Sequence, residues 1–262
     1  MTSLTLIPAP AAAGVRMGRT AAIASGKGGV GKTWLAITLA HALARHGRRV
    51  LLFDADLGLA NVDIQLGLTP VHDLADVVSG KIPLTLAAAR FVPGGFDVLA
   101  GRSGSGALSA LTPAAIERLL AELAAAAPGY DHVLLDLGAG LDRAVRRMSA
   151  WADTLLVVAT EEPTSLTDAY ATCKLHVADR PGGDIRLVVN QATTPAAAAR
   201  TAATLQRACT AFLGLAPVVA GTVRRDPHVP DAIRRQVPLL TRHPNCPAAC
   251  DVEGIASALL AS

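Results

Sequence analysis

Aromatic side chains and charges are both scarce in this sequence of 262 residues. Phenylalanine, tryptophan and tyrosine make up 3% of the chain and charged residues 17%, whereas hydrophobic residues make up 51%. Small aliphatic side chains must therefore fill the core, which suits helices packed closely on a sheet and disfavours an aromatic-rich binding groove. The hydrophobic fraction also argues against long disordered tails. The net charge of +3 does not by itself indicate nucleic acid.

Cysteine is rare as well, and long apolar runs are absent. Four scattered cysteines do not make a disulfide framework in a chain of this size, so we expect reduced thiols in a cytoplasmic protein. No apolar run is long enough to span a bilayer. The apolar segment 4–10 lacks a basic n-region and contains two prolines, so we expect residues 1–19 to form a flexible lead-in and not a signal peptide. The cysteines are Cys173, Cys209, Cys246 and Cys250.

From residue 20 onward, short aliphatic or β-branched runs alternate with amphipathic stretches. Strands are predicted over 21–25, 50–54, 96–100, 132–137, 154–159, 185–190 and 218–221. Helices are predicted over 32–45, 113–126, 142–150, 165–178, 195–213, 229–235 and 247–260. The fold class is therefore α/β, with a mostly parallel twisted β-sheet covered by helices on both faces. We find no repeat or linker, and the glycine-rich segment 101–106 is expected to be a flexible loop, so residues 20–262 are predicted to form a single domain.

A complete phosphate-loop motif, G-x-x-x-x-G-K-[ST], lies between the first predicted strand and helix. Its glycines allow successive backbone N–H groups to surround phosphate oxygens at a helix N-terminus. Lys32 is expected to reach the β- and γ-phosphates, and Thr33 is expected to ligate Mg²⁺. The predicted nucleotide-binding residues here are Gly26, Lys27, Gly28, Gly29, Val30, Gly31, Lys32, Thr33 and Trp34.

Aspartates follow two further apolar strands, at Asp54 and Asp56 and at Asp136. Ligands bind outside the carboxyl ends of parallel strands, so a carboxylate at this position can serve a bound nucleotide. An isolated strand-end aspartate is more often a helix cap. Beside a phosphate loop, however, Asp136 is expected to hold Mg²⁺ through water.

A second lysine inside the loop, Lys27, makes the segment 27–33 resemble the deviant Walker A motif of the MinD/ParA ATPases. The segment 54–63 resembles their first switch region. The similarity is narrower to the MinD-like flagellum-number regulators (FlhG, also called FleN), and it covers about residues 20 to 250. Other supporting segments are 136–140, 162–170, 221–227, 229–233 and 236–239.

The resemblance implies roles for individual residues. Lys27 would reach the partner's phosphates across a nucleotide-sandwiched homodimer and would be catalytic together with Lys32 and Asp56. Asp56 would position the attacking water, and Asp54 would support Mg²⁺. The base would be bound by Asn190, through its amide, and by a loop that closes over it, formed by Arg225, Asp226 and Pro227.

The resemblance also implies a function, namely an ATPase that acts as an ATP-dependent dimerisation switch and regulates flagellar number or placement. Hydrolysis of ATP to ADP and phosphate would be slow and stimulated by dimerisation or a partner. The partners would be a flagellar SRP-type GTPase, flagellar C-ring proteins or a flagellar transcription activator. The protein would be cytoplasmic, with peripheral association at the inner membrane or the cell pole.

The sequence departs from the family pattern in four places. Trp34 stands where the family commonly has a small or polar residue, and Thr38 stands where asparagine is usual. The first twenty residues contain no recognisable activator motif for the GTPase. No lysine or arginine follows Arg242, whereas the family's membrane anchor is a basic amphipathic helix at this end, so autonomous membrane binding is doubtful.

Three other functions remain open. The first is a ParA-type DNA-segregation ATPase whose arginine pairs bind DNA, although solvated helix faces opposing acidic residues explain those pairs better. The second is a nucleotide-gated binding module that restrains a transcription activator, with incidental hydrolysis. The third is an iron–sulfur cluster carrier using Cys246 and Cys250, whose spacing lacks further ligands nearby. The histidines show no spacing with carboxylates that indicates a metal site; those considered are His72, His176, His228 and His243.

Overall fold

The computed structural model describes residues 18–101 and 111–261. The predicted lead-in up to residue 17 and the predicted loop after Gly101 lie outside the described residues. The strands are β1 (Arg19–Ser25), β2 (Val50–Ala55), β3 (Ala89–Phe91), β4 (Phe96–Leu99), β5 (His132–Ala139), β6 (Thr154–Ala159), β7 (Asp184–Ala192) and β8 (Val218–Arg224). The α-helices are α1 (Lys32–Arg45), α2 (Val62–Leu66), α3 (Leu74–Val78), α4 (Leu84–Ala87), α5 (Pro113–Ala126), α6 (Arg143–Trp151), α7 (Pro163–Asp179), α8 (Pro195–Leu213), α9 (His228–Arg234), α10 (Leu239–Arg242) and α11 (Pro247–Leu260).

The strands form one eight-stranded sheet in the order β3-β4-β2-β5-β1-β6-β7-β8. Neighbouring strands pair in parallel except β3 with β4, which is antiparallel. The sequence predicted this mostly parallel sheet correctly. β1 lies between β5 and β6, so the loop that follows β1 emerges at the centre of the sheet's carboxyl edge, which is where ligands bind in such folds.

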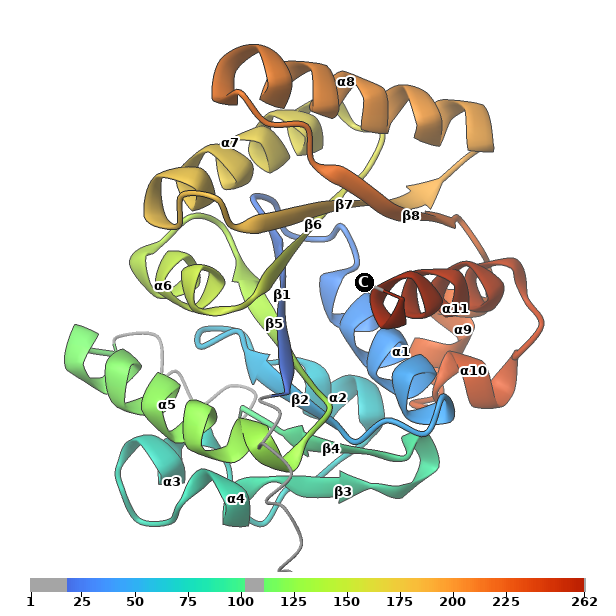
Figure 1. The fold of residues 1–262 in the computed structure, drawn as a ribbon. Coiled ribbons are helices and arrows are strands. Elements are labelled where there is room, and N and C mark those ends of the chain that lie inside the picture. Colours follow the sequence, from blue (N-terminus) through green and yellow to red (C-terminus); the bar gives the residue numbers. More distant parts are fainter. Residues whose placement is uncertain (1–17, 102–110, 262) are drawn as a thin grey trace, which may run out of the picture.

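Helices cover both faces of the sheet, as Figure 1 shows. The aliphatic core on one face includes residues of α1, α2, α9 and α11, and the core on the other face includes residues of α3 to α8. α1 is buried along most of its length, because it is enclosed between the sheet and α11. Its small and aliphatic side chains, such as Ala36 and Leu39, permit this close packing.

The segment between β2 and β4 differs from the prediction, which placed no element there. It contains α2, α3, α4 and the edge strand β3. Helices of five residues or fewer complete little more than one turn, so they show no readable periodicity of apolar side chains. In the part of the chain that the structure describes, no helix is both long and apolar enough to cross a membrane.

Candidate nucleotide-binding site

The predicted phosphate loop follows β1 and leads into α1. Gly29 and Gly31 have φ angles of 79° and 88°, in a region that only glycine adopts without strain. A Cβ on Gly31 would also lie 2.5 Å from Nδ2 of Asn190, and a Cβ on Gly26 would lie 2.6 Å from the carbonyl oxygen of Asp168. The loop therefore requires glycine at Gly26 and Gly31, and its backbone stands at a helix N-terminus, where phosphate binds favourably.

Lys32 opens α1 and is buried, with 8% of its surface exposed. Its Nζ donates a hydrogen bond of 2.9 Å to the hydroxyl of Ser25. Burial lowers the pKa of Lys32, whereas the carboxylates of Asp136 and Asp56 raise it. A buried ammonium group that feels the charge of strand-end carboxylates marks a place where an anion and a cation can bind side by side.

The surroundings of the Asp136 carboxyl group suit a bound cation. The register of β2 and β5 pairs Asp136 with Asp54, which brings both carboxyl groups to one place. Burial, with a further contribution from Asp54, raises the pKa of Asp136 to about 8, although a hydrogen bond from Thr33 opposes the shift. Oδ1 of Asp136 is buried and has no hydrogen-bond partner among the described residues. An oxygen-ligated divalent cation would satisfy this atom, so Thr33 and Asp136 fit Mg²⁺.

The carboxylate of Asp54 organises the loop that follows β2. It accepts backbone N–H bonds from Asn61 and Val62, both at 3.0 Å, and from Asp56 at 3.3 Å. Burial raises the pKa of Asp54 to about 6 although these hydrogen bonds oppose the shift. Because its oxygens already bind the backbone, Asp54 supports the cation site indirectly.

Asp56 lies at the start of this loop, and its Oδ1 accepts the backbone N–H groups of Gly58 at 3.2 Å and Leu59 at 2.9 Å. A Cβ on Gly138, after Asp136 on β5, would lie 3.2 Å from that oxygen. The side chain is only half-buried. Its charge raises the pKa of Lys32, so it lies near that lysine, and its exposed part can reach a water molecule.

The side chain of Lys27 points toward the start of α7 in its own chain. Its Nζ lies 2.5 Å from Oε2 of Glu162 and donates a second hydrogen bond of 3.1 Å to the hydroxyl of Thr164. Lys27 keeps 40% of its side-chain surface exposed. The pairing with Glu162 was not predicted from the sequence, because the two residues are far apart along the chain.

A cavity of about 590 Å³ adjoins the phosphate loop. Seven residues predicted to bind nucleotide line it, namely Gly29, Gly31, Trp34, Asn190, Arg225, Asp226 and Pro227. The amide of Asn190 donates to the carbonyl of Val30 at 2.7 Å and accepts the N–H of Gln191 at 2.9 Å. In this state the amide therefore links β7 to the phosphate loop. The Nε1 atom of Trp34 is buried and has no partner within the described part of the chain.

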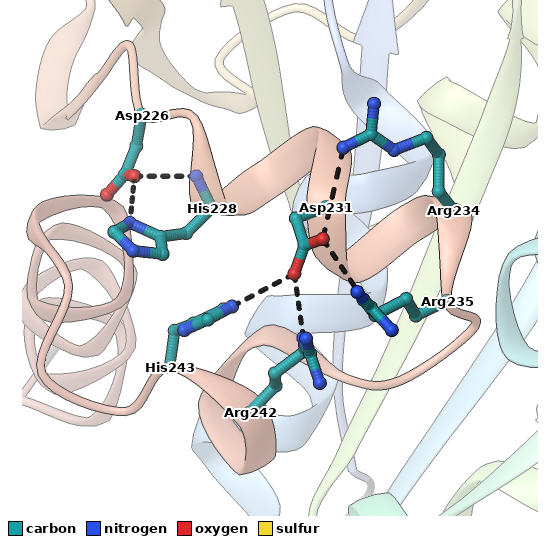
Figure 2. A network of polar contacts seen from close by, with 7 residues as sticks. All are labelled: Asp226, His228, Asp231, Arg234, Arg235, Arg242 and His243. Carbon is teal, nitrogen blue, oxygen red and sulfur yellow. Dashed lines mark hydrogen bonds and ion pairs between the residues drawn. The ribbon is translucent and has the colours of Figure 1, made fainter.

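The carboxylate of Asp226 binds neighbouring segments of the chain. Oδ1 accepts hydrogen bonds from the backbone N–H of His228 at 2.9 Å and from its ring at 2.7 Å, as Figure 2 shows. Oδ2 accepts the N–H of Ala248 in the first turn of α11 at 3.1 Å. Burial alone would raise the pKa of Asp226, but the hydrogen bonds from Ala248 and His228 lower it to about 2. Asp226 thus joins the loop along the cavity to the C-terminal helix.

The fold and the site together define a P-loop nucleotide-binding protein. Residues 21–239 match the family described as the CobQ/CobB/MinD/ParA nucleotide binding domain. The chain therefore belongs to this family, as the sequence predicted.

Two curated relatives are named as an antiactivator and as a flagellum site-determining protein. The antiactivator FleN of Pseudomonas aeruginosa is 36% identical over 235 residues, which is 90% of this chain and 84% of FleN. The flagellum site-determining protein YlxH of Helicobacter pylori is 30% identical over 174 residues, which is 66% of this chain and 58% of YlxH.

Solved MinD structures share the fold. The MinC:MinD cell division complex of Aquifex aeolicus superposes with a TM-score of 0.76 at 26% identity, covering 93% of this chain and 96% of that chain. MinD of Pyrococcus horikoshii complexed with Mg-ADP gives a TM-score of 0.75 at 24% identity, covering 94% of this chain and 98% of that chain.

Proposed function

We propose that this protein is a MinD-like ATPase that uses ATP-dependent dimerisation to regulate flagellar number or placement. The observation that carries the proposal is the arrangement under the phosphate loop. There the buried Lys32 lies within electrostatic range of Asp136, and Oδ1 of Asp136, which has no hydrogen-bond partner in the described part of the chain, can ligate a cation. The ligand that satisfies both groups is a polyphosphate with a divalent cation, and the family relationship makes that ligand Mg²⁺ and ATP.

Each part of the site contributes to hydrolysis in a different way. The loop 26–33 and Lys32 bind the phosphates, and Asp56 orients the attacking water. Thr33 and Asp136 hold Mg²⁺, which neutralises charge on the phosphate oxygens. Trp34 and the loop 225–227 enclose the base in the adjacent cavity.

Each site is completed by Lys27 of the second protomer. In the single chain its ammonium group binds Glu162 and Thr164, so it is occupied within its own protomer. Exposed ion pairs of this kind contribute about 0–1 kcal/mol, so the pair can exchange for a stronger interaction with a partner's phosphates. Dimerisation would thus supply the additional positive charge that phosphoryl transfer requires.

The flagellar role rests on the relatives. YlxH is named as a flagellum site-determining protein and FleN as an antiactivator, and FleN matches most of the chain. The name antiactivator also favours a second candidate, in which the ATP-bound form restrains a transcription activator and hydrolysis is incidental. An Asp56→Ala protein that still regulates normally in cells would favour this second candidate.

The arginine pairs give no support to DNA binding. Five of the six arginines in the pairs 146–147, 224–225 and 234–235 form ion pairs with acidic side chains, as expected for solvated helix faces. These pairs are Arg146 with Asp179, Arg147 with Glu117, Arg224 with Asp251, and both Arg234 and Arg235 with Asp231.

The switch is tested by measuring molecular mass in solution by light scattering, with Mg²⁺ and either ADP or a non-hydrolysable ATP analogue. The wild type and Asp56→Ala should be dimers with the analogue and monomers with ADP. Lys27→Ala and Lys32→Ala should remain monomers in both. A wild-type monomer under every nucleotide condition would contradict the proposal.

A further inference from the structure

Three side chains of metal-ligating type meet behind the loop that lines the cavity. Asp226 follows β8, His228 opens α9, and Cys246 immediately precedes α11. Each offers one ligand atom, and these three atoms all lie within 4.8 Å of one another. The positions 226, 228 and 246 come together only because α11 folds back against β8, so sequence spacing did not reveal the cluster.

Hydrogen bonds already align these ligand atoms. The ring Nδ1 of His228 lies 2.7 Å from Oδ1 of Asp226, and Figure 2 shows the ring turned toward that carboxylate. The thiol of Cys246 also hydrogen-bonds the Asp226 carboxylate. Ligand atoms around one tetrahedral zinc ion stand roughly 3–4 Å apart. The three atoms therefore need only side-chain adjustments to surround a single ion.

Burial and access both suit a metal. Asp226 and Cys246 are buried, with exposed fractions of 6% and 8%, whereas the His228 side chain keeps 46% of its surface exposed. An ion can enter past the histidine and reach the two buried ligands. The ring of His243, hydrogen-bonded to Asp231 at 3.2 Å, lies 4.3 Å from the ring of His228 between centroids and restricts its orientation.

We propose that Asp226, His228 and Cys246 form a zinc-binding site that joins the base-side loop to α11. A thiolate, an imidazole and a carboxylate together suit Zn²⁺, whereas Mg²⁺ prefers oxygen ligands alone. The fourth position belongs to water or to Cys250, which is exposed and follows Cys246 by one helical turn, with its N–H bonded to the Cys246 carbonyl at 3.1 Å.

Metal binding changes protonation and no oxidation state. The Cys246 thiol loses its proton to the solvent and binds as thiolate, and the proton on Nδ1 of His228 moves to Nε2, so that Nδ1 can ligate. In the metal-free protein an oxygen of Asp226 accepts one of these hydrogens, and in the metal-bound protein that oxygen ligates the ion. The hydrogen bond that Oδ2 of Asp226 accepts from the N–H of Ala248 continues to hold α11. The site is separate from the Mg²⁺ ligands of the phosphate loop.

The test is Co²⁺ and Zn²⁺ titration of the full-length, nucleotide-free protein in excess Mg²⁺, which occupies the oxygen-ligand site. Cobalt should produce a thiolate-to-metal charge-transfer band that saturates at one ion per chain and disappears on addition of Zn²⁺. Cys246→Ser and His228→Gln should each weaken Zn²⁺ affinity at least about tenfold. The matched control is His72→Gln, because His72 also lies beside an aspartate, at 3.6 Å from Asp76, and this change should leave zinc affinity unaltered.

Two results overturn the proposal. One is a wild-type protein with no thiolate–cobalt band, and the other is a band and zinc affinity that persist in Cys246→Ser. Circular dichroism of each variant checks that it is folded. A weaker band in Cys250→Ser would place Cys250 at the fourth position, whereas a band of unchanged intensity in Cys250→Ser would place water there. ATP-dependent dimerisation does not enter this measurement, so the two proposals fail separately.

Discussion

The substitution Asp136→Asn should remove the loss of stability with rising pH that Asp136 causes in the nucleotide-free protein. Burial raises the pKa of Asp136 to about 8 in the folded chain, from an ordinary value of 3.8. Between these values the folded protein holds one proton more than the unfolded chain. The contribution of Asp136 to the free energy of unfolding is therefore complete below its ordinary pKa. It is lost as the pH rises through the pKa of the folded state, with a slope of about 1.4 kcal/mol per pH unit.

From about pH 5 to about pH 7, the wild type should lose on the order of 3 kcal/mol of unfolding free energy relative to Asp136→Asn. The asparagine has the same shape and no charge to desolvate, so it is free of this penalty. Mg²⁺ with ADP should stabilise the wild type increasingly as the pH rises, because a cation favours the ionised carboxylate. It should stabilise the variant much less.

The assay is urea unfolding in a metal chelator at several pH values, repeated with Mg²⁺ and ADP. Asp142→Asn is the matched control, because Asp142 caps α6 through the N–H of Val145, and asparagine caps equally well. The control should follow the wild-type curve. If the free energies of unfolding of the wild type and Asp136→Asn change in parallel with pH, Asp136 is not a neutral carboxyl group that ionises when it binds a cation.

Three further predictions concern the loop and its surroundings. Gly31→Ala should abolish detectable ADP binding in calorimetry while the chain stays folded, because the Cβ would meet Asn190 at 2.5 Å and α1 would begin from a strained residue; ADP affinity within twofold of wild type would contradict this. Glu162→Gln should favour the ATP-bound dimer modestly, since it releases the exposed ion pair with Lys27; an unchanged or weaker dimer by light scattering would count against it. Trp34→Phe should weaken ADP binding several-fold, about the 1 kcal/mol of one hydrogen bond, because the indole N–H is unpartnered among the described residues; equal affinity would show that the N–H does not meet the nucleotide.

The sequence predicted the parts of the site that depend on local order along the chain. The phosphate loop is one continuous segment, so its motif placed Lys32 and Thr33 at the start of α1. The strand-end rule placed Asp54 and Asp136 together, because parallel neighbours in register bring equivalent positions to the same edge. For these residues the order along the chain is enough to predict their position in the fold.

Other contacts depend on tertiary packing and left no pattern to read. Lys27 and Glu162 meet because the start of α7 lies against the loop, with Asp168 in contact with Gly26. Asp226 lines the cavity beside the phosphate loop, and the sequence did not predict that its carboxylate joins Ala248 and His228. Sequence spacing gave no metal pattern for His228, because the neighbouring thiol belongs to Cys246, which directly precedes α11 and lies later in the chain.

The central claim is that two protomers build each active site, with Lys27 acting on the phosphates of its partner. It is tested most directly by mixing two inactive variants, Lys27→Ala and Asp56→Ala, and measuring ATP hydrolysis. In a mixed dimer one site has its own Asp56 and receives Lys27 from the other chain. Lys27→Ala does not dimerise by itself, but a mixed dimer keeps one of the two contacts between Lys27 and the partner's phosphates, so mixed dimers should form at high protein concentration. Equal mixing should therefore restore hydrolysis to at most about a quarter of wild-type activity, the value for random pairing in which half of the dimers are mixed and each has one intact site of two. A mixture as inactive as its components would show that Lys27 acts within its own chain, which would contradict the account.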